Sequence, residues 1–310
     1  MTTEPVGHHP VLLRQVLGLL APQPGETVVD ATLGRGGHAA AVLPLIPGGR
    51  YLGTDADADN AAFARSRLEP LAAQHGVTLT VVHQNFAGLR TAMDAAGLDH
   101  ADALLADLGF ASNQVDDPGR GLSFQGDGPL DMRLDASPDP ATGRDAPTAA
   151  DLLQTLPERE LADLIYRFGE ERLSRRIARW IVEHRGDAPI RTTAQLADLC
   201  RRAYGPAAHR AKIHPATRTF QALRIAVNGE LDALDSLLRA LPGVLAPGGR
   251  AAVISFHSLE DRPVKQTFLR YQQDGHAQRL TRKPLTAEPD ELAANPRSRS
   301  AKLRGLRWGP

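Results

Sequence analysis

The chain of 310 residues has only one cysteine, Cys200. A single thiol allows no internal disulfide and no Cys-rich zinc site, so the composition suits a reducing compartment. The chain also lacks a long apolar run, since stretches such as 251–256 are far shorter than the roughly 20 residues that span a bilayer. Residues 1–7 have neither the basic nor the apolar region of a secretory signal. We therefore expect a cytoplasmic protein that makes no membrane contact.

The histidines do not show the spacing of a metal site. His8 and His9 are adjacent, whereas a helical zinc motif places its ligands at i and i+4. We therefore expect no metal. Hydrophobic residues make up 42% and charged residues 23% of the chain, which is typical of a folded protein rather than a disordered or collagen-like one. The length suits either two domains or one large α/β domain with an insertion.

A net charge of zero conceals a strong charge asymmetry along the chain. Residues 1–171 contain 24 acids and 11 Lys or Arg, whereas residues 172–224 contain 12 Lys or Arg and three acids. Residues 262–310 are basic as well, with 11 Lys or Arg against four acids. Because arginine binds phosphate in a bidentate manner and stacks on bases, these stretches favour a polyanionic partner such as nucleic acid. The alternative is that they are solvated helix faces.

The first hundred residues alternate short apolar runs with helical patterns, which predicts βα units and a mostly parallel sheet. Glycine and proline turns separate these units. The predicted strands are 26–30, 50–55, 79–83 and 102–107, and the predicted helices are 39–46, 58–73 and 86–96.

Beyond Asp107 the pattern changes. Residues 109–147 are rich in Gly, Asp and Pro, which predicts a long irregular segment. An apolar run at 250–256 predicts a return to the sheet, so the helices between would form an insertion. The predicted helices are 149–156, 158–168, 171–184, 193–204 and a long amphipathic helix at 216–240, followed by turns at 242–243 and 247–249.

A glycine-rich loop follows the first predicted strand. Its glycines let backbone N–H groups approach a ligand, and the helix that follows adds a partial positive charge. Gly34-x-Gly36-x-x-Ala39 fits the dinucleotide fingerprint, and Asp55 ends the next strand as a partner for a ribose. These residues leave NAD and S-adenosylmethionine both open. Asp30, just before the loop, favours the cationic S-adenosylmethionine because a carboxylate would repel a pyrophosphate.

Polar residues also follow the fourth predicted strand. Asp107, Ser112, Asn113 and Gln114 lie where a doubly wound sheet places its ligands, outside the carboxyl ends of the strands. An Asp or Asn there can accept a hydrogen bond from an exocyclic amine, which favours attack of that nitrogen on a methyl group.

Seven blocks of the sequence together resemble one known family. That family is the bacterial small-subunit rRNA cytosine-N4 methyltransferases, also called the MraW family, and the matching blocks run from His9 to about Arg304. The blocks are Gly34–His38 (GRGGH), Leu105–Gly109 (LADLG), Arg120–Phe124 (RGLSF), Asp127–Arg133 (DGPLDMR), His214–Arg224 (HPATRTFQALR), Ser255–Arg262 (SFHSLEDR) and Asn295–Arg304 (NPRSRSAKLR).

The resemblance implies an α/β protein with a Rossmann-like class I methyltransferase sheet and an inserted, mostly helical domain. Residues 1–110 and 217–310 would form the methyltransferase domain, and 111–216 the insert for substrate recognition. The implied reaction is S-adenosylmethionine-dependent N4-methylation of a cytosine in the decoding region of 16S rRNA. The partner would be that rRNA or the small ribosomal subunit, and the sequence leaves a monomer and a homodimer both open.

The resemblance also implies a set of site residues. Those that would bind the cofactor are Gly36, Gly37, His38, Asp55, Phe86, Asp107 and Gln114. The family pattern is not matched everywhere: Ala111 stands where the family usually has a serine, and Gln15 where it often has an acid, so we assign neither a role.

The implied chemistry is a direct in-line transfer in which the protein mainly positions both partners. We expect Asp107 to orient the cytosine amine, and Phe110 or Phe256 to stack on an extruded base. No covalent nucleophile is needed, which suits a chain whose only thiol lies in the predicted insert. The candidate phosphate ligands are Arg133, Arg218, Arg224 and Arg262.

Two other functions compete with this hypothesis. An NAD-dependent oxidoreductase would use the same glycine loop, but Asp30 argues against it. A non-catalytic ribosome assembly factor would need the basic stretches without an intact cofactor loop, and the loop is intact.

Overall fold

The computed structural model describes residues 10–135 and 146–309, so His8 and His9 lie outside the described part. The chain divides into two compact units, Met1–Gly109 with Leu231–Pro310, and Phe110–Glu230. We call them the sheet unit and the helical unit. The helical unit extends past the predicted insert end at residue 216, because the helix that follows that point packs on helices of the insert.

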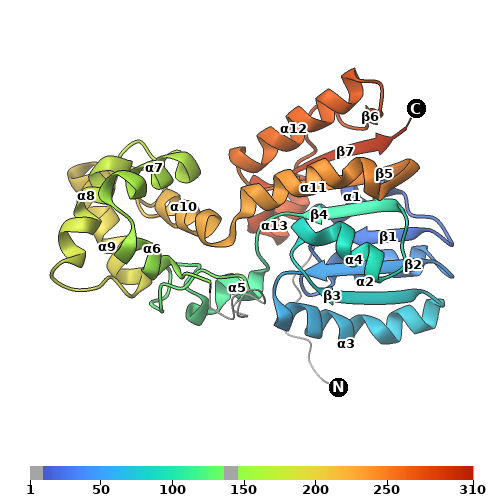
Figure 1. Cartoon of the computed structure of the whole chain (residues 1–310), viewed down its shortest axis with the longest axis horizontal. Helices are drawn as coiled ribbons and strands as arrows, with labels where there is room; N and C mark the ends of the chain where they lie inside the picture. Colours follow the sequence, from blue (N-terminus) through green and yellow to red (C-terminus); the bar gives the residue numbers. More distant parts are fainter. Residues whose placement is uncertain (1–9, 136–145, 310) are drawn as a thin grey trace. The chain divides into compact units, whose positions relative to one another are not determined.

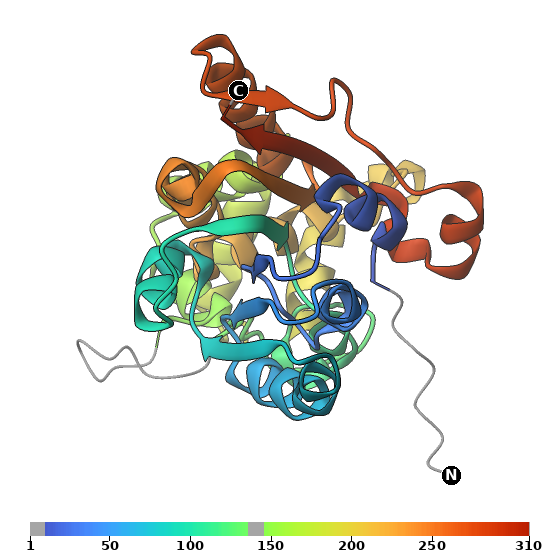
Figure 2. The same ribbon diagram turned by 90° about the vertical axis from the view of Figure 1, so that its right-hand side faces the viewer.

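The sheet unit is built on one seven-stranded sheet with the order β3-β2-β1-β4-β5-β7-β6. Figures 1 and 2 show it running from the blue and cyan N-terminal strands to the red C-terminal ones. The strands β1 to β5 are parallel, and β7 is antiparallel to both β5 and β6. The strands are β1 (Thr27–Asp30), β2 (Arg50–Asp55), β3 (Thr78–His83), β4 (Ala101–Asp107), β5 (Leu245–Ser255), β6 (Ala277–Arg279) and β7 (Lys302–Trp308).

Helices cover both faces of this sheet, because alternate strand residues point to opposite sides. One face packs Val29, Leu104 and their neighbours against three helices, and the other packs Val28 and Leu105 against three more. The first group is α4 (Leu89–Ala95), α11 (Glu230–Val244) and α12 (Ser258–Gln273), and the second is α1 (Leu13–Leu20), α2 (Gly37–Val42) and α3 (Ala58–His75). A short helix, α13 (Pro289–Ala294), precedes β7.

The helical unit has its own core of buried aliphatic side chains. A capping threonine starts two of its helices: the hydroxyl of Thr148 accepts from the N–H of Asp151, and that of Thr192 from the N–H of Gln195. The helices are α5 (Ser112–Asp116), α6 (Ala149–Thr155), α7 (Glu158–Gly169), α8 (Ser174–Arg185), α9 (Thr193–Tyr204) and α10 (Thr217–Asn228).

The prediction of one long helix at 216–240 is wrong. This segment forms two helices, α10 and α11, separated by Gly229 with φ of 58°, a left-handed conformation that ends a helix. The turn predicted at 242–243 is wrong, because α11 continues through Pro242 to Val244. There β5 begins, and a register shift against β4 accommodates residues 246–249.

Among the described residues, no helix has the length and apolar character needed to cross a membrane.

Candidate active site

The glycine loop between β1 and α2 has space for backbone only. Gly36 has φ of 76°, and a Cβ atom there would lie 2.8 Å from Cδ1 of Leu68. A Cβ atom on Gly37 would lie 2.9 Å from Cγ of Pro10. Gly36 is favoured by its positive φ, and a side chain at either position would crowd Leu68 or Pro10, as expected for a loop whose backbone N–H groups are to approach a ligand.

Asp55, at the carboxyl end of β2, fixes this loop. Its Oδ2 atom accepts a hydrogen bond from the N–H of Gly34 at 2.7 Å, and its Oδ1 atom accepts one from the N–H of Asp57 at 2.8 Å. Burial raises the pKa of Asp55, although these hydrogen bonds oppose the shift. A carboxylate has about four acceptor sites, so Asp55 can hold the loop and still accept from a ribose hydroxyl.

Asp107 and His38 approach each other from the end of β4 and the first turn of α2. Oδ2 of Asp107 lies 3.8 Å from Nδ1 of His38, and Oδ1 of Asp107 is buried with no hydrogen-bond partner among the described residues. Burial, and then the charges of Asp30 and Glu260, raise the pKa of Asp107 well above its usual value. Asp107 is therefore a carboxyl group with an acceptor atom left to satisfy.

Asp30 is enclosed by the protein's own donors. Its Oδ2 atom accepts from the hydroxyl of Tyr51 at 2.9 Å, and its Oδ1 atom accepts from the N–H of Thr32 at 3.0 Å. Burial raises the pKa of Asp30 to about 6. The sequence suggested that this acid meets a cationic ligand directly, whereas here its charge acts on the site through the pKa of Asp107.

The two remaining predicted cofactor residues lie in different units. Phe86 follows β3 and packs, partly buried, against the core of the sheet unit. Gln114 belongs to the helical unit, where it is buried and its Oε1 atom accepts from the N–H of Ala111 at 2.8 Å. A role for Gln114 in cofactor binding stays a prediction.

Of the two aromatic candidates for base stacking, Phe110 is exposed in the helical unit. The guanidinium of Arg224 lies 4.6 Å from the centre of its ring. Phe256, in the sheet unit, is partly buried, and its N–H donates to Oε2 of Glu260 at 2.8 Å.

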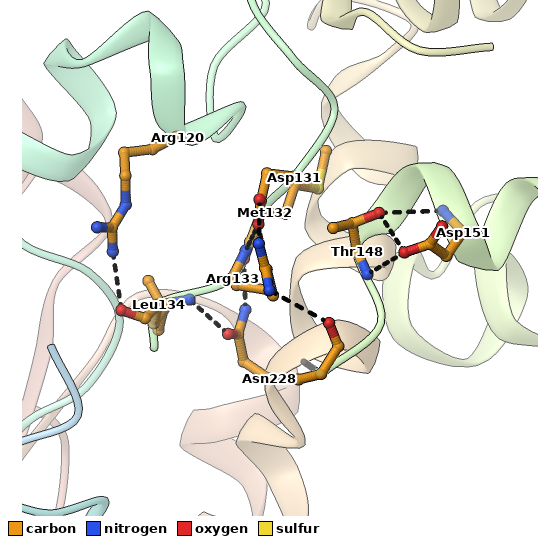
Figure 3. Close-up of polar contacts among 9 residues, drawn as sticks. Arg120, Asp131, Met132, Arg133, Leu134, Thr148, Asp151 and Asn228 are labelled. Atoms are coloured by element: carbon orange, nitrogen blue, oxygen red, sulfur yellow. Dashed lines mark hydrogen bonds and ion pairs between the residues drawn. The ribbon is translucent and has the colours of Figure 1, made fainter. Parts of the chain in front are cut away.

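The structure engages two of the predicted phosphate ligands in internal ion pairs. Arg133 binds both carboxylate oxygens of Asp131, at 2.8 and 2.7 Å, as Figure 3 shows. Arg224 pairs in the same bidentate manner with Glu230, at 2.7 and 2.8 Å. Both guanidinium groups therefore already have a carboxylate partner within the helical unit.

The loop that contains Arg133 is fixed from α10 as well. The side chain of Asn228 donates to the carbonyl of Met132 and accepts from the N–H of Leu134, both at 2.8 Å (Figure 3). Met132 is buried with φ of 67°, so this tight turn depends on its hydrogen bonds.

The other two arginine candidates are more open. Arg218 donates to the carbonyl of Glu170 at 3.1 Å, and Arg262 is exposed on α12. Their contact with RNA stays a prediction.

Sequence reasoning missed the groups that support Asp107. The hydroxyl of Thr32 accepts from the N–H of Asp107 at 2.6 Å, and the carbonyl of Val11 lies 3.0 Å from Nε2 of His38. Thr32 lies between Asp30 and the glycines of the loop, so its position in the sequence could have marked it as a site residue. Val11 contributes only a backbone atom, which no side-chain pattern reveals.

The sheet order, the antiparallel β7 and the glycine loop with acids at the ends of β1, β2 and β4 define a class I methyltransferase. Residues 5–308 match the MraW methylase family, and the chain belongs to that family. Its methyl donor is S-adenosylmethionine, and the glycine loop and Asp55 fit such a ligand.

Curated relatives resemble the chain over nearly its whole length. It is 50% identical over 300 residues to the ribosomal RNA small subunit methyltransferase H of Sorangium cellulosum, covering 97% of this chain and 90% of the relative. It is 52% identical over 287 residues to the protein of that name from Prochlorococcus marinus, covering 92% and 86%. The protein of that name from Geobacter sp. strain M21 is 46% identical over 313 residues, covering 96% and 97%.

Proposed function

We propose that the protein transfers a methyl group from S-adenosylmethionine to the exocyclic N4 atom of a cytosine in the decoding region of 16S rRNA. The names of its relatives support small-subunit rRNA as the substrate. The strongly basic stretch at 172–224 supports a polyanionic partner.

The observation that carries the proposal is the state of Asp107. Its buried Oδ1 atom has no hydrogen-bond partner among the described residues, and a buried acceptor without a donor is costly. An exocyclic amine supplies the missing N–H. A ring carbon as the nucleophile would bring no such donor to this atom.

The reaction requires a nucleophile and a proton acceptor. Bound S-adenosylmethionine supplies a methyl group on a positively charged sulfur. The amine nitrogen forms the new N–C bond, the electrons of the broken C–S bond stay on sulfur, and the nitrogen loses one proton. Asp107 accepts the hydrogen bond from the amine and then that proton, and its raised pKa makes it a stronger base than an ordinary carboxylate.

The only thiol of the chain is unsuited to covalent catalysis. Cys200 is buried in the helical unit, and burial raises its pKa to about 12. Because the thiolate is the nucleophilic form, Cys200 cannot attack a pyrimidine ring at neutral pH. This favours direct transfer to nitrogen over methylation of a ring carbon.

Mass spectrometry of 16S rRNA from cells with and without the protein tests the proposal. We expect one cytosine of the decoding region to lose a methyl group at N4 when the protein is absent, and to regain it when the wild-type chain is restored. A missing methyl at a ring carbon, at another nucleotide, or at none would contradict the proposal. Restoring the Asp107→Asn variant distinguishes a catalytic from a structural requirement.

A further inference from the structure

Four helix ends of the helical unit meet around one buried carboxylate, that of Glu171. Its Oε2 atom accepts from the hydroxyl of Tyr204, at the end of α9, at 2.7 Å. Its Oε1 atom accepts from the N–H of Leu173, just before α8, at 2.8 Å. The start of α10 joins through Arg218, which donates to the carbonyl of Glu170 directly after the end of α7. We call residues 169–174, 204–205 and 217–218 the corner.

The segment 205–218 leaves this corner and returns to it. It contains Arg210, Lys212 and Arg218 but no acid. At its beginning, Nη2 of Arg176 lies 3.8 Å from where a Cβ atom of Gly205 would be. Residues 205–210 form a 3₁₀ helix. At about 2 Å per residue, Arg210 stays within about 10 Å of Gly205. The start of this segment therefore lies beside Arg176, and the backbone that carries Arg210 stays close to it.

Several arginines of the helical unit have carboxylate partners. Arg201 and Arg202 pair with Asp198, much as Arg133 and Arg224 have their own carboxylates. Four exposed cations in or beside the corner and the segment 205–218 have no carboxylate partner in the part of the chain that the structure describes. They are Arg172, Arg176, Arg210 and Lys212.

The α8 cations lie near the start of their helix, where the carboxylate of Glu171, which accepts from the N–H of Leu173, offsets only part of their charge. Arg175 and Arg176 stand in the first turn of α8, which contains no acid. Positive charge near the start of a helix opposes the helix dipole and typically costs a few tenths of a kcal/mol to about 1 kcal/mol. A polyanion bound at this surface would remove that repulsion.

An ordered aromatic ring lies on the same segment. His214 is exposed and stacks on Phe124 with ring centres 4.5 Å apart and an angle of 24°. Its Nδ1 atom accepts from the N–H of Ala216 at 3.2 Å, which fixes the ring. Cations beside an exposed, fixed aromatic face suit single-stranded RNA, which offers phosphates and unstacked bases. An acidic protein surface would use the cations but not the ring.

We propose that Arg172, Arg176, Arg210 and Lys212 bind the phosphodiester backbone of the RNA substrate, and that His214 stacks on one of its unpaired bases. This inference rests on the proposed function for the identity of the RNA. It assigns phosphate contact to residues other than Arg133 and Arg224.

Salt-dependent binding of a synthetic decoding-region RNA to the full chain tests the phosphate contacts. The test variant is Arg176→Gln/Arg210→Gln. The matched control is Arg159→Gln/Arg191→Gln. It removes two exposed arginines at the starts of α7 and α9, whereas the corner lies at the ends of these helices. At about 0.7 to 0.9 released counterions per contact, the test variant should lower the slope of log K against log salt by about 1.5 and weaken binding roughly tenfold or more at low salt. The control should match the wild type.

The outcomes separate this inference from the proposed function. If both double variants bind RNA with the same affinity and the same salt slope, the proposed phosphate contacts are wrong, even if the wild type methylates the cytosine. An acidic protein would then be the better candidate partner for this surface. A lower slope for the test variant alone would support the phosphate contacts, even if the methylated atom proved to be another. His214→Ala should weaken RNA binding severalfold without changing the slope, and unchanged binding would remove the stacking role.

Discussion

Nδ1 of His38 lies 3.8 Å from Oδ2 of Asp107, while the other ring nitrogen, Nε2, lies 3.0 Å from the carbonyl oxygen of Val11. A carbonyl oxygen only accepts, so Nε2 carries the hydrogen. Burial lowers the pKa of His38 to about 4, so the ring is neutral at physiological pH. Nδ1 therefore turns a lone pair toward Asp107 and offers no positive charge. The neutral ring therefore does not oppose the burial and the acidic charges that raise the pKa of Asp107.

Replacing Asp107 with asparagine tests the catalytic role directly. Asparagine keeps the shape and an acceptor oxygen but cannot take the proton of the amine. We expect kcat to fall by about 10² to 10⁴, the range typical of a lost general base, whereas the loss of a cofactor contact at Asp107 would raise the KM for S-adenosylmethionine. Steady-state methylation of decoding-region RNA measures both constants.

The stability of the same variant is its control. A carboxyl whose pKa is higher in the folded than in the unfolded chain favours the fold at low pH and weakens it as the pH rises between those two values. At pH 7.5 the Asp107→Asn variant should therefore be at least as stable as the wild type to denaturant. A less stable variant with unchanged kcat would assign Asp107 a structural role instead.

The raised pKa of Asp107 also predicts the pH dependence of methylation. Only the ionised carboxylate accepts a proton, so log kcat should rise with unit slope as the pH increases toward the pKa of Asp107, then level off. That inflection should lie well above the usual carboxyl range. His38 is neutral above about pH 4 and should add no inflection of its own. The residual kcat of Asp107→Asn should not rise with pH in this way. If the pH profiles of kcat for the wild type and the variant have the same shape, Asp107 is not the base.

The hydrogen bond between Tyr51 and Asp30 predicts a pH-dependent stability. In Tyr51→Phe, Oδ2 of the buried Asp30 loses its donor, which should cost about 1 to 3 kcal/mol of unfolding free energy. The hydroxyl stabilises the ionised acid, so the loss should be larger at pH 8 than at pH 4.5, on either side of its pKa of about 6. Denaturant unfolding at both pH values measures the difference.

The matched background for that experiment is Asp30→Asn, which has no charge for the hydroxyl to stabilise. In that background, Tyr51→Phe should lower the free energy of unfolding by less, and the loss should not depend on pH. An equal cost in both backgrounds would mean that the tyrosine contributes only packing.

The βα half of the sheet could be predicted from the sequence because its signals are local. The first four strands are apolar runs bounded by turns, and the structure has them within one residue of the predicted limits. By contrast, β6 and β7 were missed. In residues 302–308 the alternation of basic and apolar side chains breaks at Gly305 and Leu306, so the pattern alone does not predict a strand, and pairing with β5 completes it. The break at Gly229 was hidden because the apolar period continues across it.

The site was partly predictable for a similar reason. The acids that end β1, β2 and β4 are visible as the last residues of apolar runs, and topology brings such strand ends together. What the sequence could not show is which oxygen each acid has left over. Both carboxylate oxygens of Asp30 accept hydrogen bonds, from Tyr51 and Thr32, whereas one oxygen of Asp107 has no partner among the described residues. That difference depends on side chains packed from distant parts of the chain.

The last prediction concerns the glycine loop. Gly36→Ala introduces a Cβ 2.8 Å from Cδ1 of Leu68 at φ of 76°, whereas Gly48→Ala meets nothing within 4 Å at φ of 74°. Both variants should lose roughly 1 to 2 kcal/mol of stability from the left-handed conformation. Only in Gly36→Ala must the buried side chain of Leu68 or the loop itself shift, so we expect only this variant to bind S-adenosylmethionine more weakly in calorimetry. Equal affinities in the two variants would show that the loop is not the cofactor cradle, because the shared backbone strain would then account for everything measured.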